Sequence, residues 1–217
     1  MNKWFYENEF YLTSDKSRIK KITDHYEIYK KVSHLEGDII ECGVFKGVSL
    51  IRFLTFRAFD SMSKIKKIYG FDIFGSFPRP KKDKIHNKRD TSFAKSHDKK
   101  IGLGIKKKKL NAILRTKGFK NFSLIEGDVT ETIEKFIKNK KKIKIALLHL
   151  DMDVYEPTKH TLNKLFKFIV KNGIILIDDY KHIRGATIAI DEFMKKNKKL
   201  KIQKISIKSR PSFIIKK

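Results

Sequence analysis

Four aspartates lie at the ends of two apolar segments, where their spacing could create a cation site. Asp151 and Asp153 come at the end of segment 143–151, and Asp178 and Asp179 end segment 173–179. If these segments are neighbouring strands of a parallel sheet, the four carboxylates meet at one edge and repel one another. A hard divalent cation relieves that repulsion, and Mg²⁺ suits a site with few protein ligands. Alternatively, Asp153 caps a helix that starts near residue 156, and the other pair forms an ordinary turn.

A third apolar segment, 38–44, runs into a glycine-containing turn. The pattern is E-x-G-x-x-x-G followed by serine, formed by Glu41, Gly43, Gly47 and Ser49. Glycines let the backbone approach a ligand closely, and the helix predicted after them would favour an anionic group at its amino terminus. The pattern lacks the G-x-G-x-x-G spacing of dinucleotide-binding proteins. A plain strand-to-helix turn would explain it equally well.

Two further strand-end acids indicate a nucleotide-like ligand. Asp72 ends segment 67–72, where an acid can accept hydrogen bonds from both hydroxyls of a ribose. Asp128 ends segment 122–128, where it could bind an adenine amino group. Each has a structural alternative, because Asp72 could cap a turn and Asp128 could cap the helix predicted from residue 130.

The remaining reactive side chains exclude several chemistries. With one cysteine, Cys42, the chain forms no internal disulfide and no thiolate zinc site. No Ser/His/Asp or Cys/His order fits nucleophilic catalysis. His149 lies inside an apolar segment, so we expect a hydrogen-bonded core residue, and His182 is either an accessory base or a surface imidazole.

The elements that must position these residues alternate regularly. Five short apolar segments alternate with amphipathic helix candidates at 47–62, 105–117, 130–139, 156–171 and 185–198, which is typical of a parallel α/β sheet with helices on both faces. Segments 201–208 and 212–215 predict a closing antiparallel hairpin. The sequence therefore predicts a Rossmann-like α/β fold.

Length and composition predict one domain over residues 1–217, because 217 residues with 40% hydrophobic content fill one core. Residues 1–35 form a helical lead-in, with Ile19, Ile22, Tyr26 and Tyr29 on one stripe. Segment 74–105 is polar and contains Pro78 and Pro80, so it is either a disordered excursion or an insert that acts as a lid over a site, and the lid is favoured.

The net charge of +27 raises the question of a polyanionic partner. Only eight of the 51 basic residues are arginine, the residue favoured for base and phosphate recognition. The lysine runs fall at predicted helix ends and polar faces, so a solvated surface is favoured over a nucleic-acid partner. No apolar run approaches the ~20 residues of a membrane helix, and the amino terminus does not read as a signal peptide, so we expect a cytoplasmic protein.

Taken together, the motifs resemble the macrocin O-methyltransferase family, which comprises S-adenosylmethionine-dependent enzymes that methylate sugar hydroxyls in macrolide and aminocoumarin biosynthesis. The resemblance runs in order over residues 35–193, and LDMDVYEPT with the downstream DDY is its specific part. The matching motifs are GDIIECGVFKGVS (37–49), YGFDIFGSFP (69–78), IEGDVTET (125–132), LLHLDMDVYEPTK (147–159), GIILIDDY and GATIAIDEF (173–193).

The resemblance implies a seven-stranded class I methyltransferase sheet, a small sugar or glycoside acceptor, and a homo-oligomer as one option. It implies Mg²⁺ held by Asp151, Asp178 and Asp179, with Asp151 or Asp153 as the catalytic base. It also implies an S-adenosylmethionine pocket built from Glu41, Gly43, Gly47, Ser49, Asp72 and Asp128. Two alternatives use other chemistry: an NAD(P)-dependent oxidoreductase in the same crevice, and a basic polyanion-binding domain without catalysis.

Overall fold

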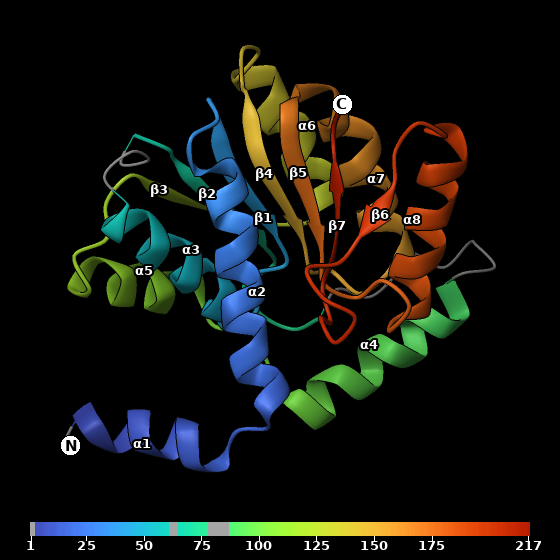
Figure 1. The fold of residues 1–217 in the computed structure, drawn as a ribbon. Coiled ribbons are helices and arrows are strands. Elements are labelled where there is room, and N and C mark those ends of the chain that lie inside the picture. The colour runs from blue at the N-terminus through green and yellow to red at the C-terminus, as the bar shows by residue number, and fades with distance from the viewer. Residues whose placement is uncertain (1–2, 61–64, 78–86) are drawn as a thin grey trace.

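The chain forms a seven-stranded sheet in the order β3-β2-β1-β4-β5-β7-β6 (Figure 1). This computed structural model describes residues 3–60, 65–77 and 87–217. Strands β1 to β5 are parallel, β7 is antiparallel to β5, and β6 is antiparallel to β7. The predicted mostly parallel sheet with an antiparallel carboxy-terminal hairpin is therefore confirmed, but the first hairpin strand covers only Ile202–Gln203 of the predicted segment 201–208. The strands are β1 Asp38–Cys42, β2 Ile68–Asp72, β3 Phe122–Glu126, β4 Ile145–Leu150, β5 Ile169–Ile177, β6 Ile202–Gln203 and β7 Ser212–Ile215.

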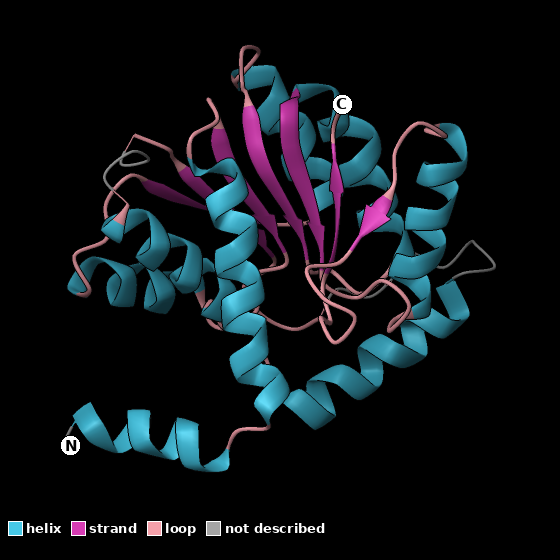
Figure 2. Cartoon of the chain, in the orientation of Figure 1, coloured by secondary structure: helices cyan, strands magenta, loops and turns pink. Residues whose placement is uncertain are grey.

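Helices cover both faces of the sheet, as predicted (Figure 2). One core cluster packs α2, α3 and α5 against the face that carries Ile39, and the other packs α6, α7 and α8 against the face that carries Ile40. Successive strand residues point to opposite faces, so an uninterrupted apolar strand serves both clusters. The helices are α1 Lys3–Thr13, α2 Lys16–Ser33, α3 Val48–Phe59, α4 Asn87–Ile101, α5 Lys107–Thr116, α6 Val129–Asn139, α7 Tyr155–Leu165 and α8 Arg184–Lys196.

The helix predicted over 156–171 is too long. Helix α7 ends at Leu165, a short 3₁₀ turn follows, and β5 already begins at Ile169. Ile169 continues the helical spacing of the preceding apolar residues, but it pairs with Ile145 of β4 and is buried in the sheet. A single isoleucine fits the apolar pattern of a helix and that of a strand. The end of α7 and the start of β5 therefore depend on pairing with β4, which the local sequence does not show.

The amino-terminal segment consists of two helices with different surroundings. Helix α1 projects from the body, whereas α2 packs across one face of the sheet (Figure 1). The predicted stripe is wrong at Tyr26, which is 45% exposed, while Tyr29 is buried. The buried face of α2 instead carries Asp24 and His25, because it meets polar residues at the carboxyl end of the sheet.

The predicted insert contains helix α4, which lies beyond the carboxyl end of the sheet (Figure 1). Pro78, Pro80 and His86 lie outside the described residues. Among the described helices, none combines the length and apolar character that crossing a bilayer requires.

Candidate active site

A cavity of about 480 Å³ opens beyond the carboxyl ends of the strands. The insert closes part of it through Phe77, Asp90 and His97. The predicted site residues that line the cavity are Gly43, Asp72, Asp128, Asp151 and Asp153. A ligand crevice at this edge is the expected place in an open parallel sheet.

The two glycines of the first turn are required by close packing. Gly43 has a φ of +92°, and a Cβ there would lie 1.9 Å from the carbonyl oxygen of Asp151. Gly47 precedes α3 with a φ of +82°, and a Cβ there would lie 2.7 Å from the Leu110 side chain. A side chain at position 43 would collide with the Asp151 backbone, so glycine there lets Asp151 lie beside the turn. At Gly47 the left-handed backbone favours glycine.

Asp72 orders the loop that follows β1. Its Oδ2 atom accepts hydrogen bonds from the backbone N–H groups of Val44 (2.7 Å) and Phe45 (2.8 Å), and Oδ1 accepts one from Phe74 (2.6 Å). A carboxylate has about four acceptor positions, so one remains for a ribose hydroxyl. The role of Asp72 in cofactor binding stays a prediction, and its hydrogen bonds to the loops also give it a structural role.

Asp128 caps helix α6, as the structural alternative for this residue predicted. Its Oδ1 accepts hydrogen bonds from the backbone N–H (2.9 Å) and the hydroxyl (2.7 Å) of Thr130. The residue also lines the cavity, so capping places its carboxyl group where a ligand can reach it.

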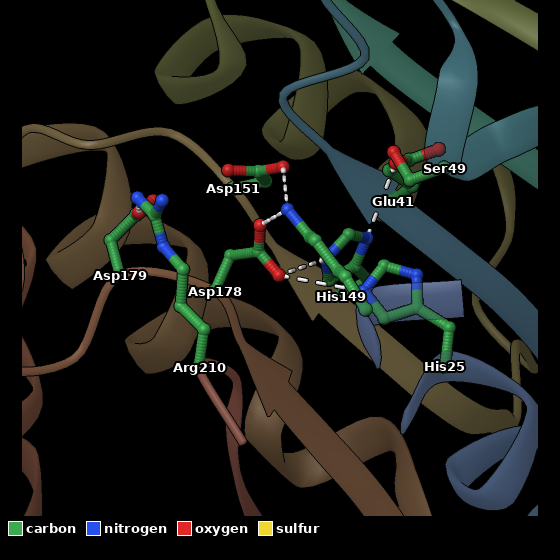
Figure 3. A network of polar contacts seen from close by, with 9 residues as sticks. His25, Glu41, Ser49, His149, Asp151, Asp178, Asp179 and Arg210 are labelled. Atoms are coloured by element: carbon green, nitrogen blue, oxygen red, sulfur yellow. Dashed lines mark hydrogen bonds and ion pairs between the residues drawn. The ribbon is translucent and has the colours of Figure 1, made fainter. Parts of the chain in front are cut away.

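Glu41 and Ser49 lie in the interior and are absent from the cavity lining. Glu41 is fully buried, accepts a hydrogen bond from the Ser49 hydroxyl, and lies 3.2 Å from Nδ1 of His149 (Figure 3). His149 is thus the hydrogen-bonded core residue that the sequence predicts. Contacts with Asp178 and Glu41 outweigh burial and raise the pKa of His149 to about 10, so the ring is a cation at neutral pH.

Asp151, Asp153 and Asp179 converge. Each offers a carboxylate oxygen, and these oxygens lie within 4.8 Å of one another. Burial and the charge of Asp151 raise the pKa of Asp153 to about 6, and burial and the charges of Asp153 and Asp178 raise that of Asp179 to about 7. Burial and Asp178 also hold the pKa of Asp151 well above its usual range. Ionising all three carboxyl groups at once is therefore unfavourable unless a cation lies among them.

Asp178 points into a separate, cationic environment (Figure 3). Its Oδ2 contacts the ammonium group of Lys21, and its Oδ1 lies 3.5 Å from Nε2 of His25 and 3.6 Å from Nε2 of His149. These contacts overcome burial and hold the pKa of Asp178 well below its usual range. The neighbouring Asp179 is bound by Arg210, whose Nη2 lies 3.1 Å from Oδ1.

The sequence interpretation missed Lys21, His25 and Arg210. Lys21 and His25 are one helical turn apart on the packed side of α2. Polar residues that interrupt an apolar stripe could have identified both as candidate site residues. Arg210 comes from the loop before β7, and its contact with Asp179 had no local signal.

Asp153 does not cap α7, so the helix-cap alternative is wrong. Asp153 has a left-handed backbone with a φ of +64°. The cap comes instead from the insert, because Oδ2 of Asp90 accepts a hydrogen bond of 2.9 Å from the backbone N–H of Tyr155. His182 is exposed, which favours the surface alternative for this residue.

This strand order, with the crevice beyond its parallel strands, defines the fold of a class I methyltransferase. The sequence profile of the macrocin-O-methyltransferase (TylF) family matches residues 11–211, and the chain belongs to this family. The resemblance drawn from the motifs is thereby confirmed.

Individual relatives agree with this assignment. The chain is 24% identical over 168 residues to demethyldecarbamoylnovobiocin O-methyltransferase of Streptomyces niveus, and the match covers 76% of this chain and 60% of that protein. The chain thus spans less than two thirds of this relative. The calicheamicin methyltransferase CalS11 has a TM-score of 0.73 at 20% identity, covering 99% of this chain and 86% of that one. The O-methyltransferase NovP has a TM-score of 0.71 at 20% identity, with coverage of 92% and 79%.

Proposed function

We propose that the protein transfers a methyl group from S-adenosylmethionine to a hydroxyl of a sugar or glycosylated acceptor, with Mg²⁺ assisting. One observation carries the proposal: in a chain of this family, a single cavity joins the strand-end acids Asp72 and Asp128 to the carboxylates Asp151 and Asp153. CalS11, which is also described as a TDP-rhamnose 3'-O-methyltransferase, supports the acceptor class. The family also favours this reaction over the nicotinamide-dependent alternative.

The cofactor end of the cavity is assigned to Asp72 and Asp128. S-adenosylmethionine, when bound, supplies a methyl group on a positively charged sulfur. The remaining acceptor capacity of Asp72 suits a ribose hydroxyl, and the Asp128 carboxylate suits an adenine amino group. The aspartate cluster gives the cavity an anionic wall, which favours a cation despite the positive net charge of the chain.

The aspartate cluster fits a hard divalent cation. Its donors are carboxylate oxygens, their pKa values are raised, and Oδ2 of Asp179 is buried without a hydrogen-bond partner within the described chain. Asp151, Asp178 and Asp179 are the ligands we propose from the family resemblance. The side-chain geometry brings together Asp151, Asp153 and Asp179, whereas the Asp178 carboxylate groups with His25 and His149. Mg²⁺, when bound, would lower the pKa of an acceptor hydroxyl.

Proton removal is assigned to the pair Asp151 and Asp153, which both face the cavity. A carboxylate within reach of the acceptor hydroxyl can take its proton as the oxygen attacks the methyl carbon. The walls formed by Phe77 and His97 of the insert would hold the acceptor and exclude water during this step.

The test measures S-adenosylhomocysteine release with nucleotide sugars and small glycosides as acceptors. We expect EDTA to abolish turnover and Mg²⁺ to restore it. We expect the double variant Asp178→Asn/Asp179→Asn to lose activity while calorimetry still detects S-adenosylhomocysteine binding. The double variant Glu27→Gln/Glu36→Gln removes the same charge at side chains 43% and 75% exposed, and serves as the control.

Each part of the proposal has its own contrary result. Full turnover by the chelated enzyme or by the aspartate double variant would overturn the metal role. Calorimetric binding of NAD, without binding of S-adenosylhomocysteine, would overturn the methyltransferase and favour the oxidoreductase.

A further inference from the structure

A lysine from the amino-terminal segment lies between two of the strand-end aspartates. The side chain of Lys21 on α2 is 11% exposed. Its ammonium group contacts Oδ2 of Asp178 and lies 4.0 Å from Oδ2 of Asp151, which comes from the neighbouring strand end. The ammonium group of lysine carries a positive charge and three hydrogen-bond donors.

The other basic side chains around the cluster approach different oxygens. His25 and His149 approach Oδ1 of Asp178, and Arg210 binds Oδ1 of Asp179. Among these four groups, Lys21 alone is paired with both Asp151 and Asp178. These two residues belong to the set that the proposed function assigns to Mg²⁺.

We propose that the Lys21 ammonium occupies the cation position between Asp151 and Asp178 in the metal-free protein and competes with Mg²⁺ for these carboxylates. The inference rests on the proposed function. One oxygen that directly pairs with an ammonium cannot also bind a hard cation closely without bringing two positive charges together. The flexible four-carbon stem of lysine permits the ammonium to withdraw when the metal enters.

Two consequences follow for the enzyme. Lys21 keeps buried carboxylates paired while no metal is bound, which limits the cost of uncompensated charge. It also raises the Mg²⁺ concentration at which the site is filled. Lys21 would therefore set the metal requirement of the enzyme without contacting either the cofactor or the acceptor.

The test is calorimetric titration of the full chain with Mg²⁺ in the absence of acceptor. Replacing Lys21 by methionine removes a unit charge near the site, so the Lys21→Met variant should bind Mg²⁺ at least about tenfold more tightly. In thermal melts, the metal-free variant should unfold at a lower temperature than the native protein, and saturating Mg²⁺ should raise its melting temperature more than that of the native protein.

Two variants serve as controls. Lys20→Met removes the same charge from the next residue of α2, whose ammonium contacts Asp24, and should leave Mg²⁺ affinity unchanged. Lys21→Arg keeps the charge and should retain the weak affinity of the native protein.

The outcomes separate this inference from the proposed function. Unchanged or weaker Mg²⁺ binding by Lys21→Met, with measurable binding by the native protein, would overturn the competition and leave the metal role intact. Absence of Mg²⁺ binding in the native protein and every variant would overturn both. If Lys21→Met fails to fold, Lys21→Gln replaces it, because its amide can still donate a hydrogen bond to Asp178, and the same tenfold tightening is required.

Discussion

Single side chains connect the carboxyl edge of the sheet to its interior. Glu41 accepts a hydrogen bond from Ser49 and pairs with His149, which in turn faces Asp178 across the strand ends. Every member is buried, so each charge depends on its neighbour rather than on water. Because these polar side chains contact one another in series, they can lie within an otherwise apolar core.

Removing the Glu41 charge should destabilise the protein strongly. Glu41→Gln leaves the buried His149 cation with one carboxylate partner fewer, and loss of one partner of a buried pair costs about 3 kcal/mol. Urea denaturation at pH 7 measures the change in unfolding free energy. In the matched variant Glu36→Gln, the lost partner is the exposed Lys144, so the midpoint should not move measurably. Equal stability of Glu41→Gln and the native protein would contradict the charged network.

The sequence could predict the acids of the site but not their partners. The strand-end positions of Asp151, Asp153, Asp178 and Asp179 follow from the local apolar pattern, because parallel strands end at one edge. The orientation of each carboxylate does not follow, since Asp178 turns toward Lys21 of α2, which is 157 residues away in sequence. Contacts of this kind depend on packing between distant segments.

At the scale of helices and strands, the insert stabilises its neighbours, a role that its amino-acid composition does not predict. Asp90 of α4 caps α7, the helix that follows the Asp151 and Asp153 strand end. The same carboxyl group packs closely on Gly185 at the start of α8, where a Cβ would lie 2.7 Å from Oδ1. The insert thus supports the site that it covers.

Asp90→Ala should therefore release the insert as well as destabilise a helix. Loss of a capping side chain costs about 1 kcal/mol, measured as a shift in the urea midpoint. Limited proteolysis should cleave segment 74–105 faster, and affinity for S-adenosylhomocysteine should fall. Asp15→Ala removes the cap of α2 without touching the insert, so it should leave both proteolysis and affinity unchanged. Unaltered proteolysis in Asp90→Ala would show that other contacts hold α4.

The order of elements was predictable, whereas some boundaries were not. Alternation of apolar segments with amphipathic helices is sufficient to predict a parallel sheet with helices on both faces. The early start of β5 at Ile169 and the polar packed face of α2 required knowledge of their partners, Ile145 and Asp178. Helical periodicity predicts which residues of a helix are buried, but it does not predict which element of the fold they pack against.

Across the molecule, the lysine runs lie on the surface, whereas the aspartate cluster lies beside the cavity. The lysines of the runs 106–109, 138–142 and 195–201 are exposed or half-buried. The aspartate cluster is gathered at one edge of the sheet beside the cavity. A net charge of +27 predicts salt-sensitive retention on DNA whatever the function, so such retention does not report on the cavity.

Ligand-linked stability distinguishes the cavity from the surface. A ligand that binds the folded state at 100 times its Kd adds about 2.7 kcal/mol of stability, which corresponds to about 5–10 °C in melting temperature for a chain of this size. We expect S-adenosylhomocysteine to produce this shift at both 50 mM and 300 mM salt, because the cavity is lined by buried and half-buried groups. A short DNA duplex should stabilise the protein only at the lower salt, and NAD at neither. A shift with DNA that persists at high salt, without one from S-adenosylhomocysteine, would favour a polyanion-binding function.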